Sequence, residues 1–343
     1  MKKAIIVILP IMFTAQACNF LFGDIYGEQA SGTRGVMVSV DSGDTWADAN
    51  KINPNKSLSG AQVMRLHIEE GTSENILAAT LNAGLYGSDD KAETWTQLLP
   101  GYSAYDVHIN PINHDEIYTS GSKGGLPAVM KSADRGGTWT RIYSAPTKGI
   151  AVEVIKFDPK NSAVIYAGLS SGTMLRSIDG GQTWKGVADL PDRIWRIALG
   201  NDAGGTIYAL LREQGFRKSQ DGGKTWVEVK LPDDAKRFND LYNDDSSPSL
   251  VMVATDKGLY RSSDSGNNWA KIGLPLNPEG SNVAVLTVNP DKKSQIFAAI
   301  KYTIYRSDDA GQTWKTVSLP TGRTVGAIVV DPEEPNRVYA GLR

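Results

Sequence analysis

One eight-residue motif recurs along this 343-residue chain, and its spacing restricts the fold more than any other feature. The motif reads Ser-x-Asp-x-Gly-x-Thr-Trp, with Ala92 in place of Gly in one copy and Asn268 in place of Thr in another. Successive copies lie roughly 45 residues apart, and a fixed period of that length is typical of a repeat architecture. Each copy contains one aspartate: Asp41, Asp90, Asp134, Asp179, Asp221, Asp264 and Asp309.

Each period contains short apolar, β-branched runs that end in Asp-Pro, Asn-Pro or Gly, such as residues 154–159. Runs of this kind are typical of β-strands, and no segment keeps a helical period over three turns. Four short strands, lettered A to D from the inside outward, fit into one period, which is the size of a propeller blade. The sequence therefore predicts an all-β fold, a single seven-bladed β-propeller with four-stranded blades over residues 34–343.

The two ends of the repeat region are incomplete in complementary ways. The first motif, at Ser39, has no A and B strands before it, and no C and D strands follow residues 325–342. Each half would leave an open sheet edge and an uncovered apolar face. We therefore predict that residues 338–341 pair antiparallel with residues 36–40, so that N-terminal C and D strands complete the C-terminal A and B strands.

The repeated motif resembles the Asp-box, also called the bacterial neuraminidase repeat. In tight turns, Ser and Asp side chains bond to nearby backbone groups, and Gly accommodates positive φ. The resemblance covers nearly all of residues 34–343 and implies that the boxes are structural and lie away from any active site. It is closest in plan to the photosystem II stability and assembly factors, which are single seven-bladed propellers, and it extends to sortilin-type and glycosidase-type propellers.

The enzymes that carry Asp-boxes fit this chain less well. Sialidases have six blades and an Arg-Ile-Pro motif near their start, whereas here Arg193-Ile194 is followed by Trp195 in mid-chain. Xyloglucan-active glycosidases resemble this chain in their Asp-Pro turns and Ile-Tyr-Ala-Gly strands, but they use two propellers with a cleft between them. Sortilin-type receptors have ten blades and a Cys-rich module.

Composition excludes several classes of function. Lys and Arg number 36 against 38 Asp and Glu, so the formal net charge of −2 gives no reason to expect nucleic-acid binding. The one cysteine, Cys18, rules out an internal disulfide framework and a thiolate metal site. No phosphate-binding loop or metal-ligand spacing is present, and we predict no cofactor, no metal site and no catalytic residue.

The first 17 residues are typical of a secretory signal of the lipoprotein type, with a basic start, an apolar run and small residues before Cys18. Lipoprotein peptidase would cut before Cys18 and leave it lipidated, while ordinary signal peptidase would accept Ala15-x-Ala17. We favour the lipoprotein, with residues 18–33 as a tether. It implies a bacterial cell-envelope protein held to a membrane by its N-terminal lipid, on the periplasmic or extracellular face.

Ligands of propellers usually bind at the mouth of the central channel, so we aligned the seven predicted A strands to find the side chains that face it. Polar groups gather in blades one to five. The candidates are Arg65, His67, Asp106, His108, Glu153, Arg193, Trp195, Arg196, Asp240 and Tyr242. An alternative explanation is that Arg65 with Asp106 and Arg196 with Asp240 only neutralise each other between blades.

Two functions remain open at this point. The first is a monomeric, membrane-tethered, non-enzymatic scaffold that binds a protein or glycan partner. The alternative is a carbohydrate-active protein, either a glycoside hydrolase or a glycan binder. A pair of channel carboxylates about 5 to 9 Å apart would favour the hydrolase, because glycosidases use two carboxyl groups at such separations.

Overall fold

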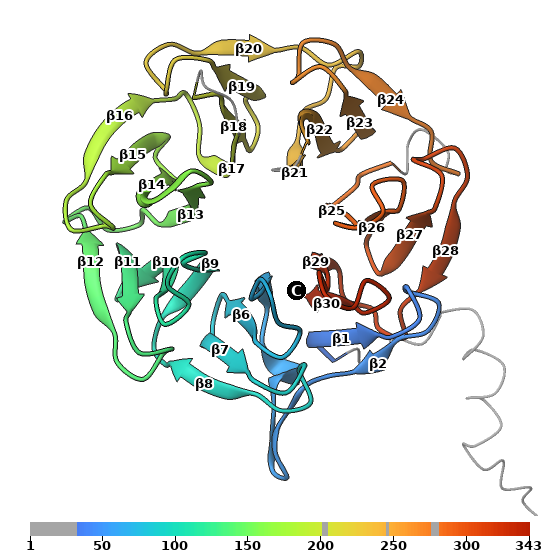
Figure 1. Cartoon of the computed structure of the whole chain (residues 1–343), viewed down its shortest axis with the longest axis horizontal. Helices are drawn as coiled ribbons and strands as arrows, with labels where there is room; N and C mark the ends of the chain where they lie inside the picture. The colour runs from blue at the N-terminus through green and yellow to red at the C-terminus, as the bar shows by residue number, and fades with distance from the viewer. Residues whose placement is uncertain (1–32, 201–204, 245–246, 276–280) are drawn as a thin grey trace, which may run out of the picture.

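Seven four-stranded antiparallel sheets stand around a central channel like the blades of a propeller (Figure 1). This computed structural model describes residues 33–200, 205–244, 247–275 and 281–343. The predicted fold class is confirmed. The signal, the tether up to residue 32 and Cys18 lie outside the described residues. Within them, no helix has the length and apolarity to cross a membrane.

Every blade consists of an inner strand, two middle strands and an outer strand that carries the blade's rim. The inner strands are β5 (Val63–Ile68), β9 (Ser103–Ile109), β13 (Val152–Asp158), β17 (Ile194–Leu199), β21 (Phe238–Asp244), β25 (Val285–Val288) and β29 (Val325–Val330). The second strands are β6 (Ile76–Thr80), β10 (Ile117–Lys123), β14 (Asn161–Leu169), β18 (Ile207–Leu211), β22 (Ser247–Thr255), β26 (Ile296–Ile300) and β30 (Val338–Leu342).

The outer half of each blade is the hairpin that contains the repeated motif. The third strands are β7 (Gly84–Ser88), β11 (Leu126–Ser132), β15 (Thr173–Ser177), β19 (Phe216–Ser219), β23 (Gly258–Ser262), β27 (Thr303–Ser307) and β1 (Gly35–Ser39). The outer strands are β8 (Thr96–Leu99), β12 (Thr140–Ser144), β16 (Lys185–Asp189), β20 (Val227–Val229), β24 (Ala270–Ile272), β28 (Lys315–Ser318) and β2 (Ala47–Asp48). A small hairpin, β3 (Lys51–Asn53) with β4 (Lys56–Ser57), and the 3₁₀ turn Leu58–Gly60 link β2 to β5.

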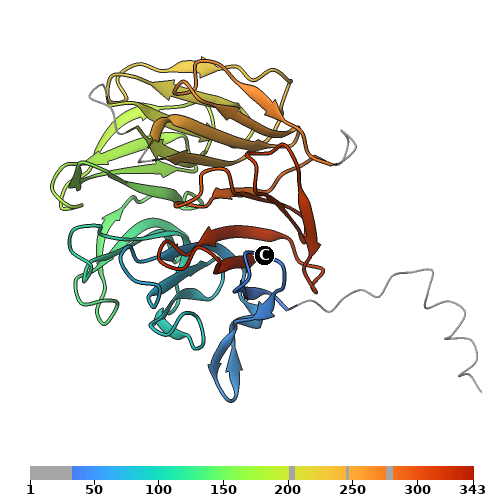
Figure 2. The ribbon, with the colours of Figure 1, turned by 45° about the vertical axis from the view of Figure 1, so that its right-hand side comes forward.

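The seventh blade joins the two ends of the repeat region, as predicted. Strand β1 pairs antiparallel with β30, from Gly35 opposite Leu342 to Ser39 opposite Val338. Both views show the blue β1 beside the red β30 (Figures 1 and 2). Apolar residues of β29, β30 and β1 then pack with the sixth blade into one buried cluster, so the closing strands share the core of the ring.

Each motif forms the same turn between the third and outer strands of its blade. In the copy of the third blade, Ser177 Oγ donates to Asp179 and accepts a hydrogen bond from the Gly181 N–H at 2.8 Å. Asp179 accepts bonds from the Thr183 backbone and hydroxyl, and these, with the Ser177 hydroxyl, lower its pKa to about 2. The residue at the Gly position has positive φ in all seven copies, including Ala92 at 67°.

The motif turns also connect neighbouring blades. Tyrosines of three second strands donate hydrogen bonds to carbonyls in the motif turn of the next blade: Tyr118 to Gly180, Tyr208 to Ser265 and Tyr339 to Lys91. Among the motif tryptophans, Trp95 is 2% exposed, whereas the other six are partly buried. The motif therefore stabilises the rim of the ring, far from the channel.

Candidate functional site

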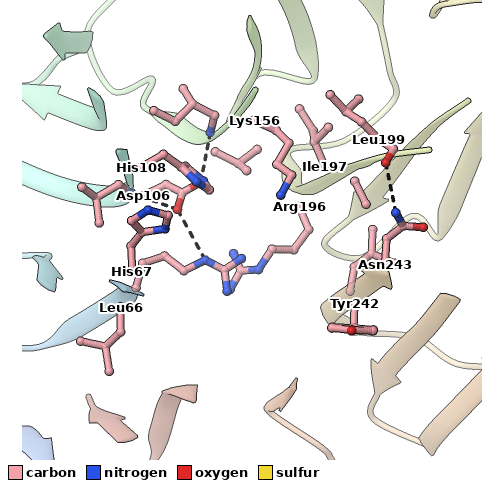
Figure 3. A pocket seen from close by; sticks show the side chains of 16 residues that line it. Leu66, His67, Asp106, His108, Lys156, Arg196, Ile197, Leu199, Tyr242 and Asn243 are labelled. Atoms are coloured by element: carbon pink, nitrogen blue, oxygen red, sulfur yellow. Dashed lines mark hydrogen bonds and ion pairs between the residues drawn. The ribbon is translucent and has the colours of Figure 1, made fainter. Parts of the chain in front are cut away.

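Side chains of the inner strands line a cavity of about 270 Å³ in the central channel (Figure 3). Because side chains of a strand alternate between faces, residues two apart form successive layers along the channel. The first layer contains Arg65, Asp106, Arg196 and Asp240, and the second contains His67, His108, Lys156 and Tyr242. Strands of the first five blades supply all eight, in agreement with the sequence alignment.

The first layer is an ion-pair network across the channel. Arg65 lies 3.6 Å from both Asp106 Oδ1 and Asp240 Oδ1, and Arg196 Nε donates to Asp240 Oδ1 at 2.8 Å. The two pairs suggested by the sequence therefore form, and Arg65 additionally joins them to each other. This layer is electrically balanced, with two cations and two anions.

The two aspartates also bond to the backbone of the neighbouring blade. Asp106 Oδ2 accepts from the Ile155 N–H at 3.1 Å, and Asp240 Oδ2 accepts from the Leu286 N–H at 3.2 Å. Burial alone would raise the pKa of Asp106, but His108, Arg65 and Arg196 lower it well below the usual range. Asp106 is therefore a permanent anion that holds adjacent inner strands together.

In the second layer, the side-chain nitrogen atoms of His67, His108 and Lys156 face the cavity. The rings of His67 and His108 meet edge to face at 5.2 Å, and His108 Nε2 lies 3.3 Å from Asp106 Oδ2. Burial, together with the nearby His108 and Lys156, lowers the pKa of His67 to about 3, so His67 is neutral near pH 7. Lys156 and Arg196 extend toward the middle of the cavity (Figure 3).

Three of the predicted residues, Trp195, Glu153 and Arg193, lie where the inner strands begin, at the opposite end of the channel from His67. The Trp195 indole donates to the Asn239 carbonyl at 2.7 Å, and its ring lies beneath the guanidinium groups of Arg196 and Arg343 at 4.5 and 5.6 Å. Trp195 belongs to the fourth blade, whereas Arg343 extends from the seventh. Their contact therefore spans the channel and obstructs this end.

Glu153 and Arg193 lie at this same end of the channel. Glu153 is buried, and Arg193 Nη1 lies 3.7 Å from its Oε1. Burial raises the pKa of Glu153, while Arg193, Arg196 and two further arginines oppose that shift. The ten candidate residues thus separate into the two channel layers and a Trp195 group that includes Glu153 and Arg193.

Sequence reasoning missed two residues of the site. Lys156 occupies the same alignment column as His67 and His108, so its position on the strand was the signal that could have identified it. Arg343 lies outside the aligned inner strands, so no such signal identified it. Its side chain crosses Gly326, where any Cβ would overlap it. For metals, the described residues hold no group of three or more His, Cys, Asp or Glu side chains placed to bind an ion.

The channel continues beyond Lys156 into a wider mouth of about 590 Å³ formed by the loops after the inner strands. Its lining is apolar at Val288, Val329 and Val330, and it includes the carboxylates of Glu70 and Asp158. A pocket open at one end, with a few polar groups at its base, is typical of a binding site.

Fold and channel together define a single seven-bladed β-propeller with a polar site in its central channel. The profile of the DUF6242 beta propeller domain matches residues 111–339, and the chain belongs to this family. That segment runs from the second blade to the closing strand β30.

Solved structures of two kinds share the fold. The GH74 xyloglucanase from Xanthomonas campestris superposes with a TM-score of 0.69 at 21% identity, covering 82% of this chain and 51% of that one. YCF48 from Cyanidioschyzon merolae gives a TM-score of 0.64 at 16% identity, covering 82% of this chain and 95% of that one. A structure of YCF48 bound to D1 peptide is similar as well, with a TM-score of 0.62.

Curated relatives with detectable sequence similarity are xyloglucanases. A probable oligoxyloglucan-reducing end-specific xyloglucanase of Neosartorya fischeri is 26% identical over 141 residues, which is 37% of this chain and 16% of that protein. Xyloglucanase Xgh74A of Acetivibrio thermocellus is 30% identical over 131 residues, which is 32% of this chain and 15% of that protein. The matched segments thus span about a sixth of these relatives.

Proposed function

We propose that this protein is a non-enzymatic binding or assembly propeller that receives its ligand in the central channel. In this proposal it works as a monomer outside the cytoplasmic membrane, tethered through lipid on Cys18. Its partner is a protein or a glycan, and it needs no nucleic acid and no cofactor.

The observation that carries this proposal is the state of the channel carboxylates. A glycoside hydrolase needs one carboxyl group that holds a proton and a second one free to attack or to activate water. Asp106 has a lowered pKa, and both Asp106 and Asp240 are 3% exposed and bonded to arginines and to backbone N–H groups. These bonds favour a structural role for the pair over acid–base catalysis. Glu153, the carboxyl group whose pKa burial raises, is buried beside Arg193 at the obstructed end of the channel, away from the cavity.

The likeness to YCF48 supports the same proposal. YCF48 is covered over almost its whole length by this chain, and one of its structures contains a bound D1 peptide. A lone propeller of this size can therefore serve as a peptide-binding module.

The tether and the channel can be tested together by capture of partners from detergent-solubilised membranes. The wild type and a His67→Ala, Tyr242→Ala double variant would serve as baits, with Lys185→Ala on the exposed outer strand β16 as the matched control. We expect the channel variant to lose a partner that the control retains. Equal capture by both variants would refute a channel site, and a Cys18→Ser protein that stays in the membrane fraction would refute the tether.

A carbohydrate-active function is the second candidate, because the relatives with sequence similarity are xyloglucanases. Release of reducing ends from xyloglucan would test hydrolysis, with an Asp106→Asn, Asp240→Asn double variant as the control. We expect no release above background from either protein. Turnover that the double variant abolishes would replace our proposal with a glycosidase.

A further inference from the structure

In the second layer of the channel, Lys156 is a cation without a counterion among the described residues. Among the described residues, no carboxylate lies within 4.0 Å of Lys156 Nζ, although the side chain is partly buried and faces the cavity. Withdrawing an ammonium group from water is costly unless an anion or hydrogen-bond acceptors replace the lost solvation. Within the described residues, Lys156 thus presents to the cavity an ammonium group without an ion-pair partner, and this is a position where an anion can bind.

The net charge around the cavity indicates what charge a bound ligand group should carry. Arg65, Lys156, Arg196 and Asp106 line the cavity. Asp240 is not part of the lining but is ion-paired with Arg65 and Arg196, so the charge network around the cavity comprises three cations and two anions. His67 is neutral near pH 7 and adds no charge. One excess positive charge matches a monoanion, whereas a dianion would place net negative charge beside two buried aspartates.

The shape of the channel indicates what kind of molecule would carry the bound anionic group. Trp195 and Arg343 obstruct the far end, so a ligand enters from the mouth and its leading group stops at the cationic layer. Val288, Val329 and Val330 offer an apolar wall to whatever follows that group, and Glu70 and Asp158 at the mouth repel a polyanion.

The other anionic classes fit these contacts less well. Phosphate groups carry between one and two charges near neutral pH, more than the single excess cation balances. Sugars are usually held by an exposed aromatic face, but Trp195 is 7% exposed and Phe157 is 6% exposed. Tyr242 is a partly exposed ring at the cavity, but a neutral sugar stacked on it would leave the charge of Lys156 unbalanced. A carboxylate remains the group that fits.

Resting on the channel site proposed above, we infer that this pocket binds a single carboxylate carried on an apolar body, with Lys156 as its ion-pair partner. Lys156 donates to the carboxylate, and the imidazole of His67 lies in the same layer as a neutral hydrogen-bonding group. A free small organic acid and the C-terminal carboxylate of a peptide both present this chemistry.

The test uses the full chain in detergent and isothermal titration calorimetry. The probes are hexanoate with its neutral counterpart hexanamide, and the peptide acetyl-Ala-Val-Leu with a free or an amidated C-terminus. We expect at least one carboxylate to bind and its amide to bind at least tenfold more weakly. Binding of hexanoate identifies a free acid as sufficient, and binding of the free peptide alone identifies a peptide terminus.

Lys156 is tested by three variants. Lys156→Gln should weaken carboxylate binding at least tenfold, Lys156→Arg should keep it within a few fold, and Lys185→Gln, on the exposed rim of the same blade, should leave it unchanged. Because no carboxylate among the described residues forms an ion pair with Lys156, the thermal midpoint of Lys156→Gln should not fall. An unchanged midpoint would show that a loss of binding is not a loss of folding.

Several results would overturn the inference: equal binding of acid and amide, unchanged binding by Lys156→Gln, tighter binding of inorganic phosphate than of hexanoate, or no carboxylate binding at all. If any of these occurs while the His67→Ala, Tyr242→Ala protein still loses its captured partner, the carboxylate assignment fails and the channel site stands. If that protein keeps its partner while Lys156 variants lose hexanoate, the carboxylate pocket stands and the proposed partner site fails.

Discussion

A disulfide between the closing strands should stabilise this protein more than the same bond inside one blade. Met37 and Ala340 are register partners in β1 and β30, and both belong to the buried cluster that joins the sixth and seventh blades. They lie 303 positions apart in the chain. Ala299 and Ile304 are register partners within the sixth blade, only five positions apart, and belong to the same cluster.

The expected difference follows from the length of chain that each bond closes. A cross-link removes conformational entropy from the unfolded state, and the gain rises with the logarithm of the loop length. For the closing pair this gives about 5–6 kcal/mol, against about 2 kcal/mol for the pair in the sixth blade. Engineered bonds often deliver less, but the strain of comparable strand pairs affects both, so the difference of about 3.5 kcal/mol is the quantity to measure.

Urea unfolding of each double-cysteine variant, oxidised and reduced, would measure that difference. The background is Cys18→Ser, and the reduced form of each variant reports the cost of the substitutions themselves. We expect the closing disulfide to raise the free energy of unfolding by clearly more than the internal one. Equal gains, or failure of Met37→Cys and Ala340→Cys to oxidise in the folded protein, would refute the closure.

Three further predictions concern the rim and the channel. Gly181→Ala should cost about 1–2 kcal/mol in urea unfolding, because its φ is positive, while the terminal methyl group of Ile142 can move aside for the added Cβ; an unchanged midpoint would contradict the turn geometry. Trp95→Ala should cost about 3–5 kcal/mol and the partly buried Trp184→Ala about half as much, measured in the same way; equal costs would contradict the difference in burial. Between pH 6.5 and 4.5, the free energy of unfolding should decrease as the pH falls, because the unfolded chain binds a proton on His67 that the folded channel excludes. The contribution of His67 is at most about 1.4 kcal/mol per pH unit. An equally steep decrease in a His67→Gln variant would exclude His67 as its source.

The architecture was predictable because each repeat carries its own local signals. The motif positions each outer hairpin, the short apolar runs supply the inner strands, and the incomplete first and last repeats leave β1 and β30 to pair with each other. The turn residues and the strand period were enough to predict the fold, because every blade packs similar residues in the same arrangement.

The site was predictable only as far as strand alternation reaches. Alternation identified which side chains face the channel, but the partners of Asp106 depend on how neighbouring blades approach each other. The lack of a counterion at Lys156 is likewise a property of five strands together. Arg343 reaches Trp195 across the ring, and no local pattern in a sequence encodes a contact of that kind.

The position of the repeated motif within each blade separates folding from recognition. Neighbouring strands lie about 4.8 Å apart, so a motif turn between the third and outer strands is more than 10 Å from the channel wall. A substitution at His67 or Lys156 therefore leaves the turn at Asp90 or Asp179 intact, and one blade can exchange its channel residue without disturbing its rim. Propellers that share every motif of this chain can consequently diverge in ligand one inner-strand residue at a time, while a whole-chain comparison continues to group them together.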